Sequence, residues 1–273
     1  NAATFSAAAT GTSCGSYSDF GSSTNGDAVL TGGSAVIAGC GLSSFARVGE
    51  GFISTAASGD FEIVTQGGAF ANATITEQIT LTAPLGANPL DLIPVAVVFS
   101  VDALLFANAP TNDFGAGTAL ARHRFKYSMS GFNPGAGGFT SGDFRWEALD
   151  DINDGDGNSL NVAPGLIVSD IIFIRPTTLN LTFGVETNFQ GKVQSFEPGV
   201  DGFADASSTA SLATSGPAII LPDGYFANSI DLGLVDNIWV DPRVVPVPAA
   251  LPLLLSALGL LGFLRHKSAA LFP

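Results

Sequence analysis

The chain is poor in charged residues, and basic residues are the scarcest of them. Its 273 residues include 10 Lys and Arg against 24 Asp and Glu, which gives a formal net charge of −14, and charged residues make up only 12% of the sequence. Binding to phosphate backbones depends on Lys and Arg, so this deficit excludes nucleic acid as a partner. An acidic surface suits calcium, or solubility through charge repulsion, better.

Residues that carry most enzyme chemistry are also scarce. The sequence has two histidines and shows no nucleophile-elbow serine, zinc-binding histidine pair or phosphate-binding glycine loop. Carboxylates are plentiful, but pairs among 24 acids indicate no glycosidase without geometry. Trp146 and Trp239 offer faces that suit sugars, although their strand-like context favours places in the core. We therefore expect no enzymatic activity.

Cysteine is limited to Cys14 and Cys40. Their spacing is not that of a CxxC motif and no histidine is near, which argues against a metal or redox site. In an exported chain we expect one disulfide between them, which contributes roughly 3 kcal/mol by loop entropy. It would fasten a Gly/Ser-rich N-terminal segment that has little apolar content of its own.

The dominant hydrophobic period is two, as in half-buried strands. In residues 72–83 one face is polar, and the other is apolar except for Glu77. Residues 178–190 repeat this pattern, and apolar residues between Ile230 and Val240 suggest a third case. The outward positions that this predicts in the first two segments include Asn72, Thr74, Thr76, Asn180, Thr182 and Glu186.

Two further runs, residues 95–101 and 166–174, are apolar on both faces, which predicts central strands covered on each side. Clusters of Gly, Pro, Asn and Asp separate the strand-like runs. A short helix near residues 39–46 is the one helical candidate before the C-terminal tail. The many short strands predict an antiparallel β-sandwich or jelly roll over residues 1–241.

The densest polar cluster surrounds the sequence Asp154-Gly155-Asp156-Gly157-Asn158. Alternating carboxylate and amide oxygens between glycines favour a calcium loop. The EF-hand pattern fails, because its sixth position is not glycine and Gly165 occupies the twelfth, where a glutamate belongs. The alternative is a solvated turn between two strands. The candidate calcium ligands are Asp151, Asp154, Asp156 and Asn158.

Three of the ten basic residues, Arg122, Arg124 and Lys126, alternate along one strand-like segment. On a strand they share one face, and His123, Phe125 and Tyr127 share the other. The stripe either pairs with acids on a neighbouring strand or docks an acidic surface of another copy of the chain.

Near the C-terminus the chain runs from Val244 to Leu264 without a charged residue and then meets Arg265 and Lys267. This length is enough to cross a bilayer core, and cations just past an apolar span favour the cytoplasmic side. We expect a proline-rich linker (242–248), a hydrophobic helix (249–264) and a short basic tail (265–273). The entry to this region reads Val245-Pro246-Val247-Pro248.

This order of proline motif, apolar stretch and basic cluster resembles the PEP-CTERM sorting signal of bacterial surface proteins, which exosortase-type membrane enzymes recognise. Val247 stands where the name-giving motif has glutamate. The resemblance implies export, transient anchoring in the inner membrane, cleavage near the proline motif and delivery to the cell surface or extracellular matrix. The start at Asn1, with no charged and apolar leader, fits a secretory signal already removed.

Together these features predict a non-catalytic, exported structural protein of the cell surface or of a matrix such as a biofilm. We expect it to associate with copies of itself into filaments or oligomers, through strand edges, residues 1–9 or the tail. In the tail, burial of leucines would drive association: Leu253, Leu254, Leu258 and Leu261. The alternative is a calcium-dependent carbohydrate-binding module at the cell surface, with polysaccharide as its ligand.

Overall fold

A computed structural model describes residues 3–12, 16–24, 27–37, 40–62, 65–108, 116–134, 138–151, 158–194 and 201–241. The chain divides into two compact units, Asn1–Asp241 and Pro242–Pro273, and all described residues lie in the first. The predicted linker, hydrophobic helix and basic tail lie outside the described residues.

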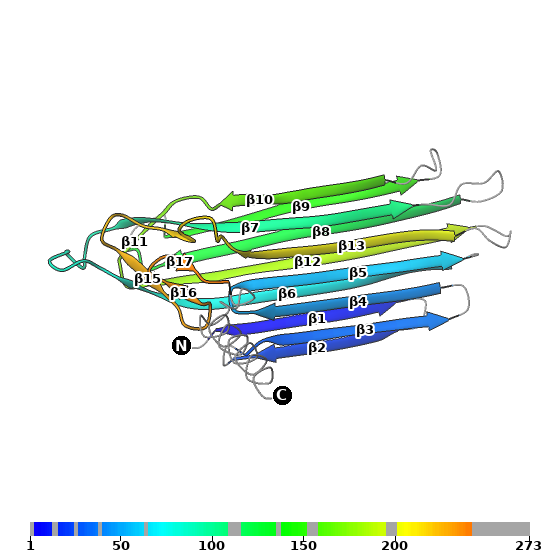
Figure 1. Cartoon of the computed structure of the whole chain (residues 1–273), viewed down its shortest axis with the longest axis horizontal. Coiled ribbons are helices and arrows are strands. Elements are labelled where there is room, and N and C mark those ends of the chain that lie inside the picture. Colours follow the sequence, from blue (N-terminus) through cyan, green and yellow to red (C-terminus); the bar gives the residue numbers. More distant parts are fainter. Residues whose placement is uncertain are drawn as a thin grey trace, which may run out of the picture. The chain divides into compact units, whose positions relative to one another are not determined.

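Two large antiparallel sheets make up the first unit (Figure 1). The first sheet has the order β2 (Tyr17–Ser23), β1 (Thr4–Thr12), β6 (Thr65–Thr82), β12 (Thr178–Gln194), β8 (Ala116–Gly131) and β9 (Phe139–Asp151). The second has the order β10 (Asn158–Val168), β7 (Ile93–Asn108), β13 (Asp201–Leu212), β5 (Phe52–Glu62), β4 (Cys40–Gly49) and β3 (Val29–Ile37). No helix occurs in the described part of the chain, and the predicted all-β, antiparallel class is confirmed.

Short strands gather at one end of the long ones, at the left of Figure 1. β15 (Phe226–Asn228) pairs with β6, whereas β11 (Ile172–Ile174) and β14 (Ile219–Ile220) both pair with β7. A separate hairpin joins β16 (Leu234–Val235) to β17 (Ile238–Trp239).

The alternating segments form strands with the predicted faces. On β6, Ile75 and Ile79 are fully buried, and on β12 the same holds for Leu181 and Phe183. The register places Ile75 beside Phe183, so the apolar faces of the two strands are continuous. The run that begins β7 is buried on both faces from Val95 to Phe99, as predicted.

Four local expectations are wrong, and the first three concern strand assignment and strand pairing. Residues 40–46 belong to strand β4 rather than to a helix. Residues 166–174 are not a central strand, because β10 lies at the end of its sheet and alternate side chains from Leu166 to Phe173 are exposed. Of the predicted segment 1–9, residues 4–9 are not available for strand addition, because β1 already pairs with β2 on one side and with β6 on the other.

The third alternating segment, Ile230 to Val240, is a tight hairpin instead of one strand. Asp236 and Asn237 both have positive φ, 48° and 73°. Two consecutive left-handed residues form the type I′ turn that suits two-residue hairpins. The turn breaks the alternation, so Ile230 and Ile238 are exposed while Trp239 is buried.

Side chains of both sheets meet in shared apolar clusters. Phe99 of β7 packs against Phe125 of β8 and Phe183 of β12, with ring centroids 5.1 and 5.4 Å apart. A second cluster holds mostly alanines with Leu42, Leu105 and Phe189. There, a Cβ on Gly59 would lie 2.2 Å from the fully buried Phe189 ring, so β5 needs glycine at this point for the ring to fit.

We expect Gly59→Val to destabilise the fold by about 1–3 kcal/mol, because the added carbons overpack a closed apolar cluster. Chemical denaturation of the variant and the wild type measures the difference. Gly216→Val is the matched control, since an added Cβ there meets nothing within 4 Å. Equal unfolding free energies for the two variants would contradict the close packing of Phe189 on β5.

Candidate functional site

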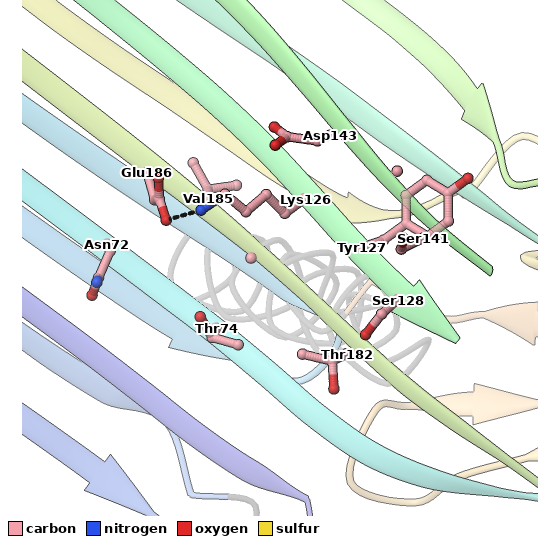
Figure 2. Close-up of a pocket in the computed structure, with 12 residues that line it drawn as sticks. Asn72, Thr74, Lys126, Tyr127, Ser128, Ser141, Asp143, Thr182, Val185 and Glu186 are labelled. Atoms are coloured by element: carbon pink, nitrogen blue, oxygen red, sulfur yellow. Dashed lines mark hydrogen bonds and ion pairs between the residues drawn. The ribbon is translucent and has the colours of Figure 1, made fainter. Parts of the chain in front are cut away.

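A polar groove of about 520 Å³ crosses the outward face of the first sheet. Strand register explains its composition, because Thr74, Gly184, Lys126 and Asp143 are direct neighbours across β6, β12, β8 and β9. A second row places Thr182 next to Ser128, and Ser128 next to Ser141. Figure 2 shows Thr74, Thr182 and Ser128 on one side of the Lys126–Glu186 pair.

The hollow exists because Gly184 has no side chain in the middle of a four-strand row. A Cβ at this position would lie 2.9 Å from the Thr74 hydroxyl oxygen and 3.1 Å from the Ala73 carbonyl oxygen. The neighbouring positions on β12, Phe183 and Val185, point into the core and are fully buried. The polar side chains of the groove therefore face solvent because their sequence neighbours face the core.

Ion pairs organise the charged side of the groove. Arg124 Nε donates to Asp143 Oδ1 at 2.7 Å, and a second nitrogen contacts Asp143 Oδ2. Glu186 accepts from Lys126 and lies 3.5 Å from Arg124 Nη1. Hydrogen bonding from Arg124 lowers the pKa of Asp143, and the same bond raises the pKa of the arginine. The four side chains thus balance two positive charges against two negative ones.

The basic stripe lies on the outward face of β8, where each member already has an acidic partner. Arg122 pairs with Glu147 of β9, and Arg124 and Lys126 pair as described above. This arrangement matches the first of the two interpretations, pairing with acids on neighbouring strands. Docking of another copy onto this stripe stays a prediction, and it would have to displace these pairs.

On the opposite face of β8, His123 is fully buried and stacks on Trp146 with ring centroids 5.0 Å apart. Within the described residues neither ring nitrogen has a hydrogen-bond partner, and the same is true of the hydroxyl of Thr187, its neighbour on β12. Burial lowers the pKa of His123 to about 4, so the ring is neutral in the fold.

The second sheet contributes polar groups to the same level of the interior. Thr55 of β5 and Ser208 of β13 are buried and share a hydrogen bond of 3.1 Å. His123, Thr187, Thr55 and Ser208 occupy equivalent places on their four strands. For each of them, of the two residues that lie two positions away along the strand, one belongs to the first apolar cluster and the other to the second. These four side chains thus form a polar layer that separates the clusters. Such a layer is a natural place for buried water.

We expect acid to destabilise the protein through His123. The neutral ring contributes its full stability above its unfolded pKa of about 6.5, and this contribution is lost as the pH falls towards 4. At pH 4.5 the loss amounts to about 2–3 kcal/mol. The measurement is the unfolding free energy between pH 7.5 and 4.5 for the wild type and for His123→Asn. Carboxylates contribute equally to the wild type and to the variant. If the unfolding free energies of the two proteins fell in parallel with pH, His123 would not be the acid-sensitive group.

A second buried titratable group is Glu77, the one polar residue on the otherwise apolar face of residues 72–83 in β6. It is 5% exposed, and the Ser229 hydroxyl donates to its Oε1 at 2.9 Å. Burial raises its pKa, and the nearby Asp231 adds to this effect. Asp231 itself accepts from the Ala3 backbone at 2.7 Å. These contacts tie the start of β1 and the last hairpin to β6, which is a structural role.

Several predicted site residues lie outside the described residues or at their limits. Asp151 ends β9 and Asn158 begins β10, while Asp154 and Asp156 are not described, so the calcium loop stays a prediction. Among described residues no group of three His, Cys, Asp or Glu side chains is placed to hold a metal. Cys40 begins β4 and is buried, but Cys14 is not described, and the disulfide also stays a prediction.

The tail residues of the sorting motif and the leucines proposed for association also lie outside the described residues: Val245, Pro246, Val247, Pro248, Leu253, Leu254, Leu258, Leu261, Arg265 and Lys267. In the part that the structure describes, no helix has the length and apolar character to span a membrane. Trp146 and Trp239 both lie in strands, and Trp239 donates from Nε1 to the Glu50 carbonyl oxygen at 3.3 Å.

The fold and the groove define an all-β protein with a hydroxyl-rich, charge-balanced surface on one sheet. No family model matches the chain, and no curated protein matches it.

Proposed function

We propose that this protein is a non-catalytic structural protein of the bacterial cell surface or extracellular matrix, and that copies of it associate. Export and sorting by an exosortase-type enzyme at the inner membrane belong to this proposal through the resemblance of residues 245–267 to the PEP-CTERM signal. The body of the protein would be a β-sandwich. Contacts of Phe99 on one sheet with Phe125 and Phe183 on the other support that architecture.

An exposed apolar patch on the second sheet is the observation that carries the proposal of self-association. Its members are Leu166, Val168, Phe173 and Ile220, which are between 43% and 58% exposed. The register brings them together around the outward face of β7: Phe173 pairs with Pro94, Ile220 with Ala96, Val168 with Val98 and Leu166 with Ser100. An exposed patch of converging apolar side chains is typical of a protein interface.

Another copy of the chain is the occupant that the charge distribution favours. With a formal net charge of −14, two copies repel each other over most of their surfaces. The patch contains no charged side chain, so repulsion is least where these residues meet. β10 is also the last strand of its sheet among the described residues, which leaves its outer edge next to the patch. Apolar burial and strand addition can therefore act at one place.

We expect the double variant Leu166→Lys, Phe173→Lys to weaken self-association at least about tenfold, because it removes two apolar contacts and adds charge to the interface. The side chains are half exposed, so folding should be unaffected. The test uses sedimentation equilibrium on the chain truncated after Val247 in detergent-free buffer, which keeps the compact unit Asn1–Asp241.

Leu85→Lys is the control, since Leu85 is fully exposed in the loop between β6 and β7 and is not a member of the patch. A truncated wild type that stays monomeric at high concentration would assign association to the tail alone and remove the patch from the proposal. The dependence of association on salt concentration distinguishes an interface at the patch from docking through the basic stripe. Raising the salt concentration screens the repulsion between acidic copies and strengthens a patch interface, whereas it loosens docking through Arg122, Arg124 and Lys126.

A further inference from the structure

We propose that the groove around Gly184 binds a neutral, polyhydroxylated ligand, such as the sugar units of a polysaccharide, without calcium. The groove lies on the first sheet, whereas the apolar patch lies on the second, so the two surfaces carry independent proposals. Its volume of about 520 Å³ falls within the range of small-ligand sites.

The charge of the groove selects against ionic ligands. Lys126 and Arg124 stand beside Asp143 and Glu186, and each positive group already contacts a negative one. An anionic or cationic ligand would gain attraction from one pair member and repulsion from the other. A neutral ligand meets no such opposition.

The polar groups of the groove suit hydroxyl groups of a ligand. Thr74, Thr182, Ser128 and Ser141 supply hydroxyls that both donate and accept, and Asn72 supplies an amide. The carboxylate of Glu186 and the ammonium of Lys126 keep further acceptor and donor capacity after pairing with each other. Adjacent sugar hydroxyls can bridge such a pair. Beside the groove, the large apolar side chains of β8 and β12, such as Phe125 and Phe183, are fully buried on the other face of these two strands, which disfavours a peptide or lipid anchored by apolar groups.

The shape of the groove also favours an extended ligand. Gly184 opens the hollow at the centre of a row that runs across four strands, and Thr74 and Asp143 mark its two ends. The lining comes from hydrogen-bonded strands rather than loops, so the groove exists before a ligand arrives. Binding to a preformed site costs little conformational entropy of the protein.

The experiment is isothermal titration of the full-length chain in a zwitterionic detergent that has no sugar headgroup. The probes are three neutral glucose oligosaccharides, maltohexaose, cellohexaose and laminarihexaose, with an oligogalacturonate as the anionic comparison. We expect at least one neutral probe to bind with a Kd below about 1 mM, more tightly than the anionic probe. Binding should persist in EDTA.

Two variants place the binding in the groove. Gly184→Val fills the hollow and should abolish binding. Thr182→Val removes one hydroxyl at nearly constant volume and should weaken binding roughly 3- to 10-fold. Thr80→Val makes the same chemical change on the outward face of β6 outside the groove, and it should bind like the wild type. Thermal unfolding checks that every variant is folded.

Three results would overturn the proposal. The first is no heat from any neutral probe at millimolar concentration. The second is wild-type affinity in Thr182→Val or in a folded Gly184→Val variant. The third is loss of binding in EDTA with no effect of either groove variant, which would move the site to the aspartate-rich residues 151–158.

Discussion

The side-chain alternation of the strands is the constraint on which the other features depend. Each long strand sends one set of residues into the interior and the next set outwards, and the paired strands keep these sets in line. Phe125 and Lys126 illustrate it: the first packs against Phe99 of the other sheet, and the second lines the groove. Interior and groove are therefore two results of one register, and a slip of one residue on β8 or β12 would destroy both.

The interior is not uniform along the strands. One cluster is built on large aromatic and branched side chains, and the other on alanines around Phe189. Between them lie His123, Thr187, Thr55 and Ser208, whose polar atoms cost free energy to bury unless they find partners. Thr55 and Ser208 satisfy each other. Among the described residues, the His123 ring and the Thr187 hydroxyl have no hydrogen-bond partner, so this layer is costlier to bury than the apolar cluster on either side of it.

Much of the sheet structure could be predicted, because local alternation is a property of each segment alone. The strands β6 and β12 and their buried faces follow from the sequence in this way. The exposure of Leu166 could not be predicted, since a strand that is apolar on both faces does not reveal whether a neighbour covers the second face. The turn at Asp236 and Asn237 depends on left-handed backbone angles, which the alternating apolar residues around it concealed.

The groove shows the same limit at the level of the site. The outward direction of Thr74 and Thr182 is predictable, but their neighbourhood is not, because Gly184 and Lys126 join them only through the pairing of β12 with β6 and β8. Likewise, acidic partners for the basic stripe could be expected on adjacent strands, while their identity as Asp143, Glu147 and Glu186 required the register.

The hairpin of β16 and β17 has a mechanical consequence. It is the last element before Pro242, and it is held by Asn237, whose carbonyl oxygen accepts from the backbone of Ala218 at 2.7 Å and whose side chain accepts from Ala227 at 2.6 Å. Trp239, the last residue of β17, is buried. A pulling force applied through the chain after Asp241 acts first on this hairpin. The hydrogen bonds that hold the hairpin must therefore break before the force reaches the long strands.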